Sequence, residues 1–333
     1  MIEILKKQWF VVLIALIFIS FAIFCAYDSN KGKLPGKSVG GKDVVATLKG
    51  DTNITADDLY KNLESTSGKS MLYMRFQAEV IDKSVKTTDA IKKTAQSYEN
   101  NIQANAESQA SSAGTDSKTL ITQQIAQYGF QYDELSDYCM TVAKMETLQN
   151  NYIEKHLDEL FAPMYKEKKS RIVSHILIKM TDANNPTDAE KKKVKEVEDA
   201  LKKGTSFAEV AKKYSDDTAS KEDGGYLGYM DTDTQYVQSF KDAAVKLKKG
   251  ETSSWVKESN TNYNGWHMIK VEETEKDAIE KDKKAKTSLY SAIATANPTI
   301  SNKYLWEAAK KLDIKYANDD VKKQIMDILD VKE

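Results

Sequence analysis

The residues of this chain best suited to acid–base chemistry or metal binding are its three histidines, His156, His175 and His267. Two of them interrupt apolar runs, since His175 lies in RIVSHILIKM and His267 lies in NGWHMIKV. An imidazole titrates near neutral pH and can bind a metal, but its burial is tolerated only where it finds a hydrogen-bond partner. The two runs therefore fit either satisfied core histidines or a functional site.

Metal chemistry fits the sequence poorly. A zinc site requires Cys, His or acidic ligands clustered at short spacing, or an HExxH motif, and the sequence has neither. The only cysteines are Cys25 and Cys139, so no disulfide is available within the region that follows the N-terminal segment. This scarcity of thiols is compatible with an oxidising exterior. We expect no metal and no other cofactor.

The two histidine runs bound a segment with the pattern of a compact α+β domain. Apolar runs predict three strands, and helical spacing predicts three helices between the first strand and the other two. The strands fall at 171–180, 251–259 and 264–273, and the helices fall at 190–204, 205–215 and 238–250. The glycines of DDTASKEDGGYLGYM predict tight turns. Because alternate residues of a strand share a face, His175 is expected beside Leu177, and His267 beside Ile269.

The composition argues against a nucleic-acid partner. Lys and Arg number 49 and Asp and Glu number 50, which gives a formal net charge of −1. The lysines are interleaved with acids instead of forming a basic patch, and such a mixed surface typically serves solubility. With 333 residues, the chain is long enough for two or three domains.

The N-terminal segment 9–27 carries no charge and is bounded by Trp9 and Tyr27. As a helix it would cover roughly 28 Å, about the thickness of a hydrocarbon core, with its aromatic ends at the two interfaces. A cleaved signal peptide is an alternative, and Cys25 suggests a lipoprotein. Phe24, however, stands where lipoprotein processing needs a small side chain. We favour an uncleaved single-pass anchor in the cell membrane.

The regions on either side of the α+β segment are mostly helical. Thr55 followed by Asp58 predicts a helix start close to a capping box, and 71–84 has an apolar face at helical spacing. The polar segment 85–112 predicts an exposed helix. Residues 117–168 predict an amphipathic helix that is broken once, at a Tyr-Gly-Phe turn.

The central segment resembles the parvulin-type (PpiC or rotamase) peptidyl-prolyl isomerases in blocks that follow one another in the family's order: SHILIK, SFAEVAKKYSDD, GGYLGYM, SFKDAAVKLKKGE and GWHMIKV. The N-terminal VVATLKG and ITADDLYKNL, and the C-terminal NKYLWEAAKKLDIKYANDDVKKQIMDIL, resemble the chaperone region of PrsA-like and SurA-like foldases. The resemblance implies an α+β fold in which a parvulin domain with a small, antiparallel, four-stranded sheet is inserted into a mostly helical chaperone lobe, preceded by an N-terminal transmembrane helix.

This resemblance also implies how the chain is divided. We expect a cytoplasmic N-terminus at 1–8, the anchor at 9–27, a linker at 28–42, the first part of the chaperone lobe at 43–168, the parvulin domain at 170–274 and the second part of the lobe at 275–333.

The resemblance assigns roles to residues of the central segment. Catalytic roles fall on His175, Asp217 and His267, and the two histidines are expected to be neighbours that share a hydrogen bond. A substrate pocket for the proline ring would be lined by Leu227, Tyr236 and Phe240.

The implied function is that of an extracytoplasmic peptidyl-prolyl cis-trans isomerase and chaperone. Its partners would be unfolded or partly folded secreted proteins with X-Pro bonds, and the cell membrane through the N-terminal helix. A homodimer formed through the chaperone lobe is a further hypothesis. Tyr226 stands where the family usually has Asp, and Tyr236 stands where it has Met. These departures leave an alternative open, a holdase chaperone whose parvulin domain is weak or inactive.

Overall fold

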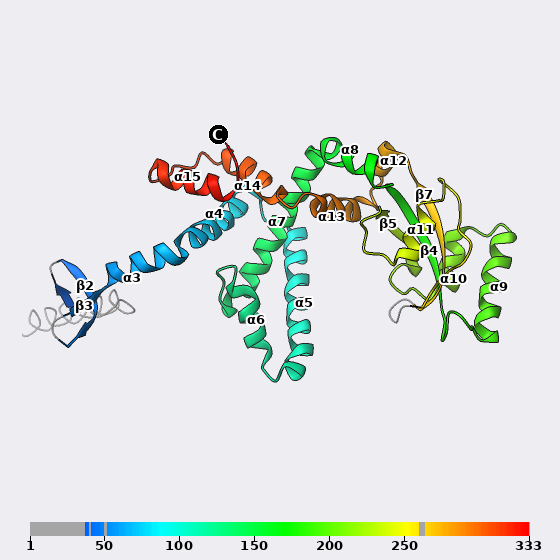
Figure 1. Cartoon of the computed structure of the whole chain (residues 1–333), viewed down its shortest axis with the longest axis horizontal. Coiled ribbons are helices and arrows are strands. Elements are labelled where there is room, and N and C mark those ends of the chain that lie inside the picture. The colour runs from blue at the N-terminus through cyan, green and yellow to red at the C-terminus, as the bar shows by residue number, and fades with distance from the viewer. Residues whose placement is uncertain (1–36, 40, 50–51, 260–263, 333) are drawn as a thin grey trace, which may run out of the picture. The chain divides into compact units, whose positions relative to one another are not determined.

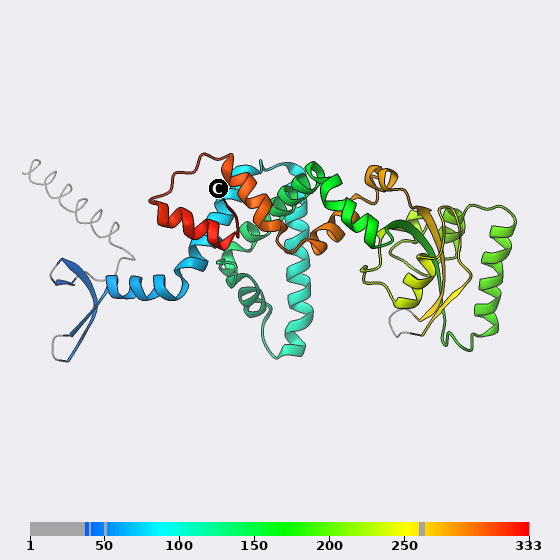
Figure 2. The ribbon, with the colours of Figure 1, turned by 45° about the horizontal axis from the view of Figure 1, so that its top comes forward.

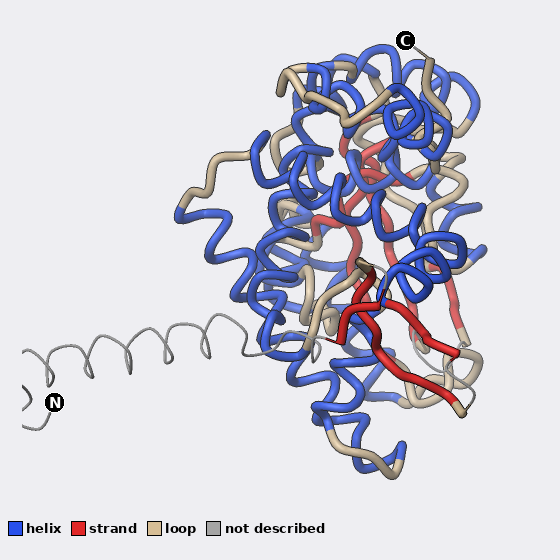
Figure 3. The backbone as a smooth tube through the Cα atoms, turned by 90° about the vertical axis from the view of Figure 1, so that its left-hand side faces the viewer, coloured by secondary structure: helices blue, strands red, loops and turns tan. Residues whose placement is uncertain are grey.

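The structure is a computed structural model, which describes residues 37–332 except 40, 50–51 and 260–263. The chain divides into two compact units between Arg75 and Phe76. In Figure 3 the strands, drawn in red, belong to two sheets, and most of the remaining described chain is helix.

The first unit contains a small antiparallel sheet followed by a helix. Its strands β1 (Lys37–Val39), β2 (Lys42–Leu48) and β3 (Thr52–Thr55) pair in chain order, so β1 occupies part of the predicted linker. Helix α3 (Ala56–Leu63) continues as a π-helical turn, η1 (Glu64–Gly68). The Thr55 amide donates to Asp58 Oδ2 at 3.1 Å, and the Asp58 amide donates to Thr55 Oγ1 at 3.2 Å. The reciprocal bonds form the predicted capping box.

After α3, five further helices precede the second sheet within the described residues, and the first of them crosses the boundary between the two units. They are α4 (Lys69–Ser84), α5 (Asp89–Ala113), α6 (Ser117–Ala126), α7 (Leu135–Lys155) and α8 (Leu157–Glu167). A 3-10 turn, η2 (Tyr132–Glu134), lies between α6 and α7.

The prediction of an exposed helix over 85–112 is wrong along one face of α5. Ile91, Ala95 and Ala106 of this helix are buried in a cluster with Cys139 and Ala143 of α7. Apolar side chains are a minority in α5, so its sequence is polar on average. They nevertheless share one side of the helix, and packing of that side against α7 buries them.

The C-terminal helices return to α7 and α8, beside which Figure 1 and Figure 2 both draw α13. The four helices are α12 (Lys276–Lys281), α13 (Lys286–Ala296), α14 (Ile300–Lys310) and α15 (Asp319–Ile328). One buried cluster joins Ile153 and Phe161, from before the second sheet, to Leu289, Ile293 and Ile300 from after it. Segments far apart in sequence therefore share one hydrophobic core.

The second sheet has four antiparallel strands in the order β5-β4-β7-β6, which confirms the expected sheet. The strands are β4 (Arg171–Lys179), β5 (Tyr226–Met230), β6 (Val256–Glu258) and β7 (Gly265–Glu273). The residue pattern alone missed β5, because this five-residue strand contains a glycine and lies in a segment rich in turn residues.

Helices cover both faces of this sheet. They are α9 (Asp188–Lys202), α10 (Phe207–Tyr214) and α11 (Gln238–Ala244), and a 3-10 turn, η3 (Lys221–Asp223), precedes β5. Ile176 and Ile178 pack against α9 and α10, whereas Val173 packs with Phe240 and Ala244 of α11. Because both faces of β4 are covered, the strand reads as a nearly continuous apolar run. Burial of each such side chain contributes about 1.5–3 kcal/mol.

Among the residues that the structure describes, no helix has the length and apolar content required to cross a membrane. The predicted N-terminus at 1–8 and the predicted anchor at 9–27 lie outside the described residues.

Candidate active site

Two adjacent strands bring His175 and His267 together. In the β4–β7 ladder His175 pairs with Ile269, and Leu177 pairs with His267, so the two histidines are diagonal neighbours on one face. Their ring centroids are 5.6 Å apart with an interplanar angle of 24°, and the two Nδ1 atoms are 3.4 Å apart. Both residues are buried. The register of the ladder thus explains why both apolar runs contain a histidine.

Asp217 follows α10 and contacts His175 at Nε2, the ring nitrogen that does not face His267. Its Oδ2 lies 2.8 Å from His175 Nε2 and also accepts a hydrogen bond from the Ser220 hydroxyl. The Ala219 amide donates to Asp217 Oδ1 at 3.3 Å. The hydrogen bond with His175, aided by the one from Ser220, lowers the pKa of Asp217 below its ordinary value despite partial burial. Asp217 is therefore an anion at neutral pH.

The charge of Asp217 determines the direction of the hydrogen bonds. An ionised carboxylate can only accept, so His175 Nε2 carries the proton of that bond. In the neutral ring Nδ1 is then the acceptor, and it can accept from His267 Nδ1–H. This assignment of tautomers follows from the hydrogen-bond network. Asp217, His175 and His267 form one polar chain within an otherwise apolar site.

An apolar pocket of about 140 Å³ lies beside this chain. A cavity of about 150 Å³ is known to hold one benzene molecule, so the pocket has the right size for a single proline ring. It is lined by His175, Leu177, Asp217, Leu227, Tyr236, Val237, Phe240 and His267. All six site residues expected from the sequence thus meet in one place.

Two residues that line the pocket, Leu177 and Val237, are not among the six site residues predicted from the sequence. Strand alternation already placed Leu177 on the face of His175, and that signal was sufficient to find it. Val237 immediately precedes α11, and nothing in the local sequence pattern marks it.

Phe240 forms the aromatic side of the pocket. Its ring meets Tyr236 edge to face at a centroid distance of 5.1 Å, and it meets His175 and His267 in the same manner at 5.9 and 6.0 Å. Such edge-to-face pairs stabilise beyond the effect of burial alone. The three contacts hold the Phe240 ring in place, so the pocket is largely preformed.

The turn that carries Tyr236 is organised by a buried carboxylate. Asp231 Oδ1 accepts from the amides of Asp233 and Thr234, both at 2.9 Å, and Asp231 Oδ2 accepts from the Tyr229 hydroxyl at 3.0 Å. These bonds satisfy the buried charge and connect the turn to the adjacent strand. Asp231 therefore fixes the backbone just before Tyr236.

Gly225 is required beside His175. The His175 amide donates to the Gly225 carbonyl at 2.8 Å, and Gly225 has φ +79°, in the region that favours glycine. A Cβ at this position would lie only 2.1 Å from the His175 carbonyl oxygen. The second glycine of GGYLG is thus explained by a close approach to the histidine strand, whereas a Cβ at the first, Gly224, would lie 2.6 Å from the Ala208 Cβ of α10.

Tyr226, one of the two departures from the family pattern, does not line the pocket. Its hydroxyl donates to Asp282 Oδ1 at 3.1 Å, and its ring packs against the core shared by α8 and α13. The second departure, Tyr236, lies within the pocket and packs on Phe240. Across the described residues, no group of three His, Cys, Asp or Glu side chains is arranged to hold a metal ion.

The fold and the site define the class of protein. Residues 160–275 match the family model for the PPIC-type PPIASE domain, and the four-stranded sheet with its ring-sized pocket has the form that the parvulin resemblance predicted. The central domain is that of a parvulin-type peptidyl-prolyl cis-trans isomerase.

The similarity to known proteins extends well beyond this domain. The chain is 31% identical to Foldase protein PrsA 2 of Bacillus cereus over 287 residues, which cover 85% of this chain and 87% of that protein. It is 30% identical to Foldase protein PrsA of Bacillus subtilis over 290 residues, 86% of each chain. The chain belongs to the PrsA foldase family. The crystal structure of PrsA from Bacillus subtilis is also similar, at 28% identity and a TM-score of 0.47, covering 86% of this chain and 98% of that one.

Proposed function

We infer that this protein is a peptidyl-prolyl cis-trans isomerase and chaperone that assists the folding of secreted proteins. The observation that carries this inference is the ring-sized apolar pocket, which has the anionic Asp217 on its wall. Membership of the PrsA foldase family supports the same role for the whole chain.

The chemistry follows from the nature of the reaction. Rotation about a peptide bond meets a barrier of about 18–20 kcal/mol, because the planar amide is stabilised by resonance, and isomerisation of X-Pro bonds is slow enough to limit folding. No covalent bond breaks. An enzyme therefore needs only to bind the twisted amide better than the planar one.

The residues of the pocket are suited to this task. Leu227 and Phe240 offer apolar contact to the proline ring, and Asp217 places a negative charge on the same pocket. The planar amide carries partial negative charge on its oxygen, and this charge diminishes as the bond twists. A nearby anion therefore disfavours the planar form more than the twisted one. His175 holds the carboxylate in place and keeps it ionised.

The test is the isomerisation rate of a proline peptide with the purified full chain. We expect Asp217→Asn to lower kcat/KM at least tenfold, which corresponds to about 1.4 kcal/mol of transition-state stabilisation. Asp216→Asn is the matched control, since the Asp216 carboxylate pairs with Lys193 at 2.6 Å and does not line the pocket. A wild-type chain that suppresses aggregation but accelerates no isomerisation would support the holdase alternative instead.

We assign the chaperone role to residues 43–168 and 275–333, and isomerisation to 170–274. Large apolar side chains exposed on the helical elements include Leu59, Leu63 and Met71, and such adaptable side chains suit varied clients. Excision of 170–274 with a short Gly/Ser bridge tests this division, because Ile172 and Glu273 pair in the sheet and the ends are close. The excised protein should fold and still suppress aggregation; an unfolded product would contradict the division.

We also propose that residues 9–27 anchor the protein in the cell membrane, with its body on the extracytoplasmic side. The uncharged run and the membership of a foldase family support this proposal. Protease added to protoplasts should remove the body, whereas protection until lysis would contradict the orientation. A homodimer through the chaperone lobe is a further proposal, and sedimentation of the full chain in lipid nanodiscs would test it.

A further inference from the structure

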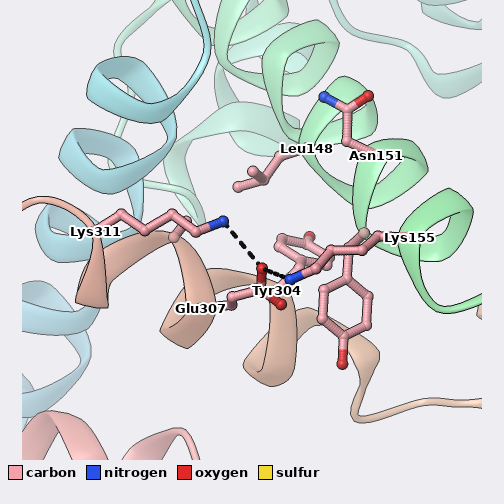
Figure 4. Close-up of a pocket in the computed structure, with 8 residues that line it drawn as sticks. Leu148, Asn151, Lys155, Tyr304, Glu307 and Lys311 are labelled. Carbon is pink, nitrogen blue, oxygen red and sulfur yellow. Dashed lines mark hydrogen bonds and ion pairs between the residues drawn. The ribbon is translucent and has the colours of Figure 1, made fainter.

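A second pocket lies in the helical part of the protein, between α7 and α14 (Figure 4). We call it the α7–α14 pocket. Its volume is about 160 Å³, close to the cavity of about 150 Å³ that is known to take a benzene molecule. It is lined by Leu148, Asn151, Tyr152, Lys155, Tyr304, Glu307, Ala308 and Lys311. The pocket can therefore seat one aromatic or branched aliphatic side chain.

The helix spacing explains why the pocket exists. Helix α7 contributes residues at positions i, i+3, i+4 and i+7 from Leu148, and α14 with its C-cap residue Lys311 contributes residues at the same spacing from Tyr304. On α14 this stripe includes Ala308, whose short side chain leaves space between the helices. Leu148 packs against the α5–α7 core, and Tyr152 packs against the core shared with α13. The pocket thus lies between the α5–α7 core and the core shared with α13, which form two separate clusters.

The rim of the pocket carries more positive than negative charge. Glu307 Oε1 accepts from Lys155 Nζ at 2.7 Å and from Lys311 Nζ at 3.0 Å, and Glu307 Oε2 lies 3.3 Å from His156 Nε2. Hydrogen bonds from these groups, that of Lys155 first, lower the pKa of Glu307 to about 2. At neutral pH two ammonium groups therefore face one ionised carboxylate, and the dashed lines in Figure 4 mark their contacts with Glu307.

Both lysines remain able to bind a second anion. Their side chains are 60% and 68% exposed, and each ammonium group has three donors. Glu307 is only 25% exposed and holds the two lysines at the rim. An acidic group that enters from solvent would thus meet two oriented cations directly above an apolar floor.

We propose that the α7–α14 pocket binds a single aromatic or branched aliphatic side chain of an unfolded client, with preference for one flanked by acidic residues. This inference rests on the proposed chaperone function and deepens it, because it names the class of client segment that the helical part recognises. The apolar floor supplies affinity through burial, and the lysine rim supplies selectivity for charge.

The test measures binding of labelled, proline-free Gly/Ser peptides to the full chain in lipid nanodiscs. One peptide carries a single Phe flanked by two Asp, the second carries Phe flanked by two Lys, and the third carries Ala flanked by two Asp. We expect the Phe/Asp peptide to bind at least fivefold more tightly than either of the others. Equal binding of all three would overturn the proposal.

Two variants locate the binding. Ala308→Leu should fill the pocket and weaken binding of the Phe/Asp peptide at least tenfold. Lys311→Glu, at an exposed position whose change should not disturb folding, should abolish or reverse the preference for Asp over Lys. Lys310→Glu is the matched control, because Lys310 is exposed on the same helical turn but does not line the pocket. A Lys310→Glu effect equal to that of Lys311→Glu would overturn the proposed site.

A measurement of aggregation suppression distinguishes a failure of the proposed chaperone function from a failure of the proposed pocket. If the wild-type chain suppresses no aggregation, the chaperone function fails, whereas peptide binding that is lost in Ala308→Leu would still support the pocket. If the wild type suppresses aggregation and Ala308→Leu retains full peptide binding, the pocket assignment is wrong while the chaperone function stands.

Discussion

His175 is hydrogen-bonded at both ring nitrogens, to Asp217 at 2.8 Å through Nε2 and to His267 at 3.4 Å through Nδ1. It is therefore the central member of the polar chain, and its removal would leave two neighbouring groups without that partner. Removal of His267 would leave the bond between His175 and Asp217 intact. The two histidines are thus not equivalent, although each lies in a buried strand.

We predict that His175→Ala lowers the free energy of unfolding more than His267→Ala does. Loss of a partner by a buried polar group costs about 1–3 kcal/mol, and His175→Ala removes a hydrogen bond from both Asp217 and His267. Chemical denaturation of the two variants measures the difference. Equal losses in both variants would show that the bond to Asp217 adds nothing to stability.

The stability contributed by Asp217 should depend on pH in a defined direction. Its pKa in the folded protein is lowered from the ordinary value of 3.8, so the ionised form favours folding. This contribution is present above the ordinary pKa and is lost as the pH falls below about 4 toward the folded pKa. The difference in unfolding free energy between the wild type and Asp217→Asn should therefore shrink over that acidic range. A difference that grows on acidification would contradict the assignment.

Gly225 should tolerate no larger residue. Gly225→Ala places a Cβ in the space of the His175 carbonyl oxygen, at 2.1 Å, in addition to the cost of a left-handed backbone. Gly204 is the matched control, with φ +85° and nothing within 4 Å of an added Cβ. We expect Gly225→Ala to lower the unfolding free energy by roughly 1–3 kcal/mol more than Gly204→Ala does. Similar losses would show that the strand can shift without cost.

Ser288 of α13 should stabilise the edge of the isomerase sheet. Its hydroxyl accepts from the Tyr229 amide at 2.8 Å and donates to the Ala285 carbonyl at 2.9 Å. Ser288→Ala leaves the strand amide without this acceptor, so we expect a loss of about 1–3 kcal/mol in thermal or chemical unfolding. Thr295→Ala, on the same helix, removes only a hydroxyl bonded to its own helix and should cost little. If both variants unfold alike, the contact between α13 and β5 does not contribute.

The sequence by itself predicted most of the helices and strands of the central domain, although not β5, and its resemblance to the parvulins pointed to the six expected site residues. Apolar runs and glycine stops are local signals, and the block from SHILIK to GWHMIKV preserved them in a recognisable order. Alternation along the strand already placed Leu177 beside His175. The capping box at Thr55 was equally predictable, because both of its partners lie within four residues of each other.

The tertiary structure decided what depends on distant segments. The register of β4 against β7 sets His175 and His267 side by side, and no local pattern fixes a register between strands 92 residues apart in sequence. The burial of Ile91 in α5 and the existence of the α7–α14 pocket depend on which helix packs opposite. Helix packing depends on the surfaces of two helices, so the sequence of one helix specifies only its own side of each contact.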